Sequence, residues 1–168
     1  MPKIIENLPE LLAAEARKQV EEAGYGALTV RSVAKACGVG VGTVYNYYPS
    51  KEALVASFML SDWKVCVAAM EQSSEKAEAL SAVLQTVHQQ LLYFIDLHSR
   101  IFRDNAAMQG FTGSLSRYHN LLRSQLAAPI RKFCPDDFTA EFIAEALLTW
   151  TIAGKSFGEL ESIIKKLV

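Results

Sequence analysis

Apolar residues recur at intervals of three and four along nearly the whole chain, and no segment alternates with the period of two that a half-buried strand needs. Residues 8–23 show this pattern well, with Pro9 suited to a first helical turn and Gly24 suited to a helix end. A chain that is 51% hydrophobic and 21% charged has the composition of a folded globular protein. We therefore predict an all-α fold, with one domain or two small ones within the 168 residues.

Short helices come first. A second helix is predicted to follow Thr29, a suitable N-cap, and to run to Gly38. A third covers residues 41–47, "VGTVYNY", and a proline two residues later prevents its continuation. Ser50 is the expected N-cap of a fourth and longer helix that reaches about Gln72.

The later apolar stripes are longer and are separated by breaks that contain glycine or proline. They predict four further helices, over residues 77–104, 115–133, 138–153 and 156–168. The second of these is expected to bend near Pro129. The last begins with Ser156 followed three residues later by Glu159, which is the spacing of a capping box.

Several classes of site lack the residues that they need. The three cysteines are widely spaced and odd in number, and the three histidines have no metal-ligand spacing. No Ser/His/Asp, Cys/His or HExxH arrangement is present, and no glycine-rich phosphate loop follows a strand. Asp136 and Asp137 fit the start of a helix better than an acid–base pair. We expect no enzymatic activity, no cofactor, no disulfide framework and no metal site.

The hydropathy pattern bears on location. No run approaches the roughly 20 apolar residues of a membrane helix, because charged residues or histidines interrupt the apolar stretches. The start, "MPKIIENLPELL", lacks the apolar centre of a secretion signal. We therefore expect a cytoplasmic protein without a membrane partner.

The charges are unevenly distributed, although the net charge is only −1. Residues 25–51 contain Arg31, Lys35 and Lys51 and no acidic residue, whereas residues 52–168 hold 11 basic and 13 acidic side chains. Attraction to phosphate depends on where charge is located, so a local basic window suits a DNA-contacting surface. Three cations in such a window are also compatible with an ordinary surface.

Residues 30–49 fit two helices joined by a tight corner. The helices are predicted to cross at a small residue, Ala34. The side chains predicted to point into their shared interior are Val33, Cys37, Val39, Val44 and Tyr47. The corner falls on a glycine, number 38, which tolerates a conformation that strains other residues. This is the arrangement of a helix-turn-helix, whose second helix enters the DNA major groove, although any helical hairpin can imitate it.

The segment "GYGALTVRSVAKACGVGVGTVYNYYPSKEAL", residues 24–54, resembles the TetR family of bacterial transcriptional regulators. It has Gly-Tyr, a helix led by threonine, Ala-x-x-x-Gly-Val, and then Gly-Thr-x-Tyr-x-Tyr-Tyr-x-x-Lys-Glu-x-Leu. The match covers the first third of the chain without a gap. It implies a helix-turn-helix DNA-binding domain over residues 1–49 and a helical ligand-binding and dimerisation domain over residues 50–168.

The resemblance also implies a set of DNA-contacting positions. They are Thr29, Arg31, Gly40, Val41, Gly42, Thr43, Tyr45, Asn46, Tyr47 and Lys51. Gly42 would allow close approach of the backbone, and Thr43 would contact a base. The hydroxyls of Tyr45 and Tyr47 would contact phosphates, as would the ammonium of Lys51. The next tyrosine, at position 48, is expected to fill the core instead.

Two positions depart from the family pattern. Gly40 stands where the family often has serine at the head of the recognition helix, so a side-chain contact to phosphate is lost. Val41 stands where a polar or basic residue is common, and it can offer only apolar contact, for instance to a thymine methyl group. Base recognition is therefore expected to be sparse.

The resemblance implies a homodimer through helices 115–133 and 138–153, because one helix-turn-helix covers only a short half-site. It also implies an effector pocket in the middle of the chain. The candidate lining residues are Trp63, His88, Tyr93, Phe94, His98, Met108, Phe111, Tyr118 and Trp150. Each of these is also compatible with plain core packing, and His98 is interpreted as a core histidine.

Three functional classes are compatible with these patterns. The first is a dimeric, sequence-specific regulator, most simply a repressor released from a palindromic operator by a small molecule. The second is an architectural DNA-binding protein without an effector. The third is a helical enzyme or carrier that contains a helix-turn-helix hairpin.

Overall fold

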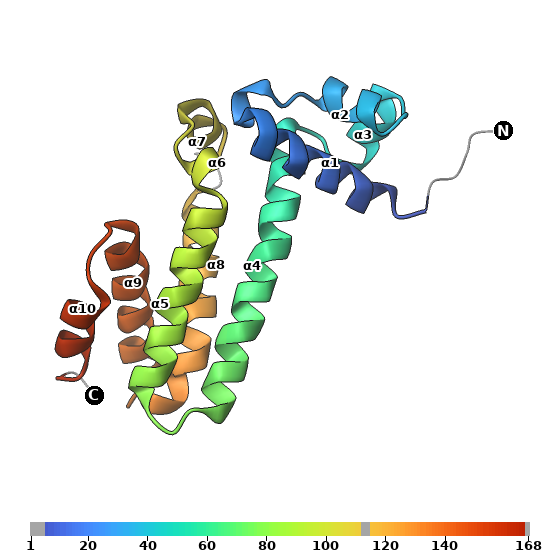
Figure 1. Ribbon diagram of the computed structural model, residues 1–168. Coiled ribbons are helices and arrows are strands. Elements are labelled where there is room, and N and C mark those ends of the chain that lie inside the picture. The colour runs from blue at the N-terminus through green and yellow to red at the C-terminus, as the bar shows by residue number, and fades with distance from the viewer. Residues whose placement is uncertain (1–5, 112–114, 167–168) are drawn as a thin grey trace. The chain divides into compact units, whose positions relative to one another are not determined.

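The computed structural model describes residues 6–111 and 115–166, and every regular element in these ranges is a helix (Figure 1). The predicted all-α class is confirmed. The elements are α1 (Leu8–Ala23), η1 (Tyr25–Ala27), α2 (Val30–Ala36), α3 (Val41–Tyr47), α4 (Lys51–Lys76), α5 (Leu80–Leu97), α6 (Ser99–Phe102), α7 (Asn105–Phe111), α8 (Leu115–Ala127), η3 (Ala128–Phe133), α9 (Asp137–Ile152) and α10 (Phe157–Ile164).

These helices form two compact units. The N-terminal unit contains α1, η1, α2, α3, α6, α7 and the part of α4 up to Ser61. The C-terminal unit contains the rest of α4, from Asp62, together with α5, α8, η3, α9 and α10. Each unit has its own apolar core, so each buries a separate set of side chains.

The division of the structure differs from the boundary predicted between residues 49 and 50. Leu54, Val55 and Phe58 of α4 lie in the core of the N-terminal unit, as do Ile101 of α6 and Ala107 of α7. Three short helices cannot bury enough apolar surface alone, so later segments of the chain complete this small core.

The predicted helix over residues 77–104 is broken. His98 leaves helical geometry, with φ −105° and ψ 17°, and α5 ends just before it. Its ring is almost fully buried, stacks on Phe58 with centroids 6.0 Å apart, and packs edge-on to Phe102. His98 is thus a core residue of the N-terminal unit, and the chain turns there to bring α6 and α7 into that unit.

The remaining helix ends show which local signals hold. The bend near Pro129 is present, because α8 ends at Ala127 and continues as a 3-10 helix. Asp136 caps α9, and its Oδ1 accepts a hydrogen bond from the Thr139 N–H at 2.6 Å. Ser156 precedes α10, but its side chain makes no capping hydrogen bond, so the predicted capping box is wrong.

Helix α4 is the longest helix in the described part of the chain. An 18-residue window within it has mean hydropathy 1.5, so by length and composition alone it could cross a membrane. The expectation that no segment approaches this threshold was therefore wrong. Leu54 and Phe58 lie in one core, and Trp63, Cys66 and Met70 lie in the other, which is the position of a core helix in a globular protein.

The C-terminal unit packs α5, α8, α9 and α10 around a shared interior (Figure 1). Leu84 and Val87 of α5 and Ile143 and Leu147 of α9 are fully or almost fully buried in it. Gly154 ends α9 in the left-handed conformation, with φ 67°, and lets the chain turn into α10.

Candidate nucleic-acid interface

The corner between α2 and α3 is built by Gly38. Its φ is 67°, in the left-handed region that side chains disfavour. The N–H of Val39 donates to the carbonyl oxygen of Ala34 at 3.0 Å, and the N–H of Gly38 donates to that of Lys35 at 3.2 Å. These two bonds form a Schellman motif, which ends α2 and redirects the chain. The predicted glycine corner is confirmed.

The inner face of this corner is closely packed. Val33 and Ala34 of α2 and Val44 of α3 have no exposed surface, and Cys37 and Val39 are half-buried beside them. These residues fix how α3 is held against α2, as the sequence pattern predicts.

Tyr47 is the exception, because 49% of it is exposed and its predicted position in the interior is wrong. The following residue, Tyr48, points inward instead and donates its hydroxyl to the carbonyl oxygen of Pro9 at 3.0 Å. The expectation that Tyr48 fills the core is therefore confirmed. Because Tyr48 occupies the interior, Tyr47 is left on the surface.

The outer face of α3 carries most of the implied DNA-contacting residues. Tyr45 is 50% exposed, and Gly40, Gly42 and Asn46 are exposed. Val41 and Thr43 are half-buried, and Val41 packs partly against the core of the N-terminal unit. The implied contact of Val41 with a base therefore competes with packing inside the protein.

Gly42 is not required by the fold. A Cβ atom at this position would have no neighbouring atom within 4 Å, and its φ is not in the left-handed region. A glycine inside a helix costs about 1 kcal/mol relative to alanine. Gly42 therefore lowers the stability of α3 without improving its packing. A close approach of another molecule to the helix backbone would account for a glycine at this position.

The N-terminus of α2 carries the other implied contacts. Thr29 Oγ1 accepts a hydrogen bond from the Ser32 N–H at 2.9 Å, and Ser32 Oγ accepts one from the Thr29 N–H at 3.2 Å. The predicted N-cap is thus confirmed. The hydroxyl proton of Thr29 is not used in this capping bond, and Thr29, Arg31 and Lys35 are all exposed.

Lys51 differs from a freely exposed lysine. Its Nζ donates to the carbonyl oxygen of Tyr25 at 2.6 Å and lies 3.8 Å from the centroid of the Tyr25 ring. Burial lowers the pKa of Lys51, while the neighbouring carboxylates of Glu52 and Asp104 raise it. Tyr25 itself was not among the predicted site residues, because a lone tyrosine before a loop gives no sign of which lysine it will meet.

The residues predicted to line an effector pocket fall in both units. Four of them lie in the C-terminal unit. Trp63 is part of its core, Phe94 and Trp150 pack against that core, and His88 is buried. The remaining described members are elsewhere: His98 and Met108 belong to the N-terminal unit, and Tyr93 is 55% exposed. The side chains of Phe111 and Tyr118 lie outside the described part of the structure.

Three of these aromatic residues have polar partners within the C-terminal unit, and one of them is Trp150, whose indole N–H donates to the Ser156 carbonyl oxygen at 3.1 Å. Trp63 donates its indole N–H to Gln125 Oε1 at 2.7 Å, and its ring meets that of Phe94 edge-on at 5.2 Å. His88 Nδ1 lies 2.9 Å from the Thr151 hydroxyl, and its ring stacks on Phe157. Burial lowers the pKa of His88, which favours its neutral form.

Comparison with known proteins supports the interpretation of α1 to α4. Residues 12–58 match the family model described as "Bacterial regulatory proteins, tetR family". The HTH-type transcriptional regulator UidR of Escherichia coli K12 is 25% identical over 72 residues, which are 43% of this chain and 37% of UidR. UidR of Shigella flexneri matches to the same extent. The matched region thus spans little more than a third of the curated relatives.

Solved structures match along nearly the whole chain. FadR of Thermus thermophilus, described as a TetR family transcriptional repressor in complex with lauroyl-CoA, has a TM-score of 0.65 at 20% identity, covering 95% of this chain and 92% of FadR. A transcriptional regulator of Rhodococcus sp. RHA1 has a TM-score of 0.61 at 20% identity and covers 96% of both chains. At these identities the likeness shows that the fold is shared.

Proposed function

We propose that this chain, whose residues 12–58 match the tetR family of bacterial regulatory proteins, is a sequence-specific DNA-binding transcriptional regulator. We further propose that it acts as a homodimer on a palindromic operator. The observation that carries this proposal is the two-sided character of α3. Val44 on one side has no exposed surface, while Gly42 and Asn46 on the opposite side and the tyrosines 45 and 47 at the two edges are exposed. Members of the family are DNA-binding regulators rather than enzymes.

In this proposal α3 lies in the major groove, where the edges of all four base pairs differ. Gly42 lets the helix backbone approach the DNA, and Thr43 contacts a base. Tyr45 and Tyr47 donate their hydroxyls to phosphates, and the Thr29 hydroxyl and the Arg31 guanidinium do the same from α2. Contacts to phosphates fix position on the duplex rather than sequence, so specificity rests on few side chains.

The homodimer is proposed to form through α8 and α9, since useful affinity needs two helix-turn-helix units on neighbouring half-sites. Phe138, Phe142 and Ile152 of α9 are 78%, 53% and 65% exposed. Their spacing of four and ten residues places them on one side of the helix. A second copy of the chain would remove this apolar stripe from water.

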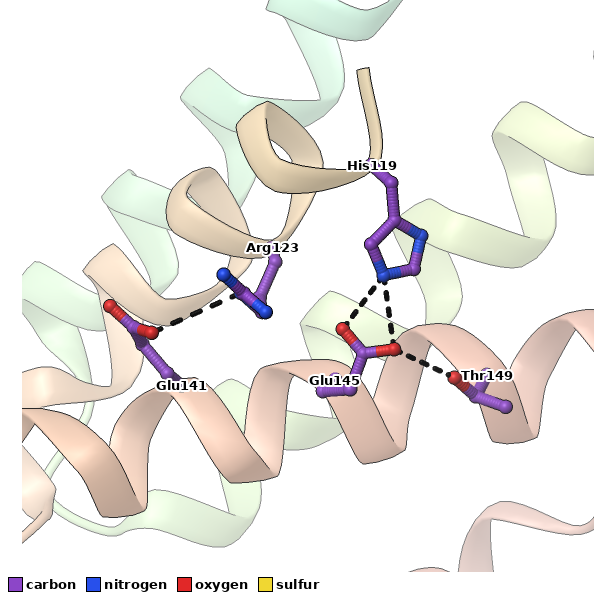
Figure 2. A network of polar contacts seen from close by, with 5 residues as sticks. All are labelled: His119, Arg123, Glu141, Glu145 and Thr149. Atoms are coloured by element: carbon purple, nitrogen blue, oxygen red, sulfur yellow. Dashed lines mark hydrogen bonds and ion pairs between the residues drawn. The ribbon is translucent and has the colours of Figure 1, made fainter. Parts of the chain in front are cut away.

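Polar pairs connect α8 and α9, as Figure 2 shows. His119 Nε2 of α8 lies 2.8 and 3.0 Å from the two carboxylate oxygens of Glu145 of α9. Thr149 donates its hydroxyl to Glu145 at 3.2 Å, and Arg123 pairs more loosely with Glu141 at 3.9 Å. Glu145 and Thr149 continue the spacing of Phe138 and Phe142 along α9, so the proposed dimer surface is mixed rather than wholly apolar.

We further propose that the regulator is a repressor released by a small-molecule effector held in the C-terminal unit. Trp63 and His88 combine burial with a polar group, which suits an effector that is largely apolar with few hydrogen-bonding groups. Such a ligand would act through α4, which belongs to both units. A constitutive architectural DNA-binding protein without an effector is the second candidate.

Selection of bound sequences from a random DNA pool tests the regulator directly. Enrichment of a sequence with two inverted half-sites is expected. Binding without enrichment would favour the architectural protein, and the absence of binding would overturn both. Compounds that release the enriched sequence would then support the effector, whereas a ligand that binds without changing operator affinity would contradict it.

A further inference from the structure

Tyr25 contacts the ammonium of Lys51 with both its ring and its backbone carbonyl oxygen. The Lys51 Nζ lies 3.8 Å from the centroid of the tyrosine ring and 2.6 Å from the tyrosine's carbonyl oxygen. The first contact is a cation–π interaction and the second is a charge-assisted hydrogen bond. A lysine side chain has four rotatable bonds, so two contacts from one residue restrict where its charge can lie.

The tyrosine ring is itself held in place. Tyr25 is only 3% exposed, and its hydroxyl donates to Glu52 Oε1 at 2.9 Å. The side chain of Glu52 lies against α7 in turn, because a Cβ atom at Gly110 would lie 3.0 Å from Glu52 Cγ. Burial and the hydrogen bond to Glu52 therefore restrict the position of the ring that contacts Lys51.

The contacts leave Lys51 able to bind a further group. An ammonium has three N–H donors, and the Tyr25 carbonyl accepts from one of them. Lys51 is half-buried rather than enclosed. Glu52 and Asp104 act on it electrostatically but form no part of these two contacts.

We propose that Tyr25 is a positioning residue, which holds the Lys51 ammonium where it meets a DNA phosphate and so raises DNA affinity without touching DNA. This inference rests on the proposed DNA-binding function. It assigns to the buried tyrosine a role distinct from its contribution to the core. The alternative is that Tyr25 and Lys51 stabilise the N-terminal unit and act on DNA binding only through folding.

A double-mutant cycle separates these two roles. The full chain and its Tyr25→Leu, Lys51→Ala and doubly substituted variants are titrated into a labelled random-sequence duplex at one low salt concentration. Lys51→Ala is expected to weaken binding about tenfold, the scale of one charge-assisted contact, and Tyr25→Leu several-fold. The double variant is expected to bind no more weakly than Lys51→Ala alone. The proposal would be overturned if the affinity losses of the two single variants multiply in the double variant. It would also be overturned if Tyr25→Leu binds the duplex as tightly as the wild type.

Tyr25→Phe keeps the ring below Lys51 and loses only the hydroxyl, so it serves as the conservative variant. With Lys51 present, Tyr25→Phe is expected to bind DNA almost as tightly as the wild type and more tightly than Tyr25→Leu. With Lys51→Ala, the two substitutions at Tyr25 are expected to give the same affinity. If Tyr25→Leu does not fold, an ε-CH₂-labelled Lys51 reports on the ring instead. Its ring-current shift is expected to persist in Tyr25→Phe and to move further on addition of the duplex, and a Lys51 signal unchanged by the duplex would overturn the proposal.

The outcomes also separate this inference from the proposed function. Failure of the wild-type protein to bind the random duplex at low salt would overturn the DNA-binding function and the positioning role together. Binding by the wild type with multiplying losses would overturn the positioning role alone.

Discussion

The hydroxyl of Tyr48 donates a hydrogen bond to the carbonyl oxygen of Pro9, 3.0 Å away and 39 positions earlier in the chain. This bond joins the end of α3 to the start of α1. It assigns opposite roles to neighbouring tyrosines. Tyr48 packs against the core of the N-terminal unit, whereas Tyr45 and Tyr47 are 50% and 49% exposed. We therefore expect the stability of the unit and its proposed contact with DNA to depend on different members of the same cluster.

Single removal of these hydroxyls should separate the two effects. Tyr48→Phe is expected to lower the free energy of unfolding by about 1 kcal/mol, because the Pro9 carbonyl loses its donor. Its affinity for a DNA duplex should be unchanged. Tyr45→Phe should leave stability unchanged and weaken DNA binding about fivefold, the effect of one lost hydrogen bond to a phosphate. Chemical denaturation and duplex titration measure the pair, and loss of affinity in Tyr48→Phe alone would contradict the assignment.

Two glycines near the corner should respond in opposite ways to alanine. Gly38→Ala is expected to destabilise the protein by about 1 kcal/mol or more, because φ at this position is 67°. Gly42→Ala should stabilise it by up to about 1 kcal/mol, since the new methyl group meets no atom within 4 Å. Despite this gain, Gly42→Ala should weaken DNA binding. A Gly42→Ala protein that is more stable and binds DNA equally well would show that no close approach occurs there.

The helix-turn-helix could be predicted from the sequence because its signals are local. A threonine before an apolar run, a glycine at the corner and a proline after α3 each act within one helical turn, and α2 and α3 lie where these signals indicate. The placement of Tyr47 was wrong because its spacing fits both the inner and the outer edge of α3. Which of Tyr47 and Tyr48 enters the core is decided by Pro9, far away in the sequence.

The dimer surface can be tested by one charge. Phe142→Asp is expected to weaken self-association at least about a hundredfold, because it places a carboxylate in the middle of the apolar stripe on α9. Leu92→Asp is the matched control, since Leu92 is also exposed, at 44%, but lies on α5. Sedimentation should show a dimer for the control and a monomer for Phe142→Asp. The proposed surface would be contradicted if both variants were dimers or if both were monomers.

His88 predicts how stability depends on pH. Burial lowers its pKa below the ordinary value of 6.5, so the unfolded chain binds this proton more readily than the folded protein does. The stabilising effect is therefore complete above pH 6.5 and is lost as the pH falls below it towards the folded-state pKa. His88→Gln keeps a hydrogen-bonding group near Thr151 but does not titrate. Denaturation at about pH 8 and about pH 5.5 should show a smaller decline for this variant than for the wild type. An equal decline would contradict a buried neutral His88.

The composition of the two units was beyond the reach of sequence patterns. Residues 77–104 carry one continuous apolar stripe, yet its last part, from His98, belongs to the N-terminal unit. The stripe reports that each residue is buried but not which core receives it. The contacts of Lys51 were missed for the same reason, because Tyr25 lies 26 positions away and no local pattern connects them.

The salt dependence of binding to a random-sequence duplex tests the central claim most directly. If the exposed side of α3 and the basic residues of α2 and α4 meet a DNA backbone, the logarithm of the affinity should fall linearly with the logarithm of salt concentration. The slope should decrease in magnitude by about one in Lys51→Ala. An affinity that does not change with salt, or no binding at low salt, would contradict the account.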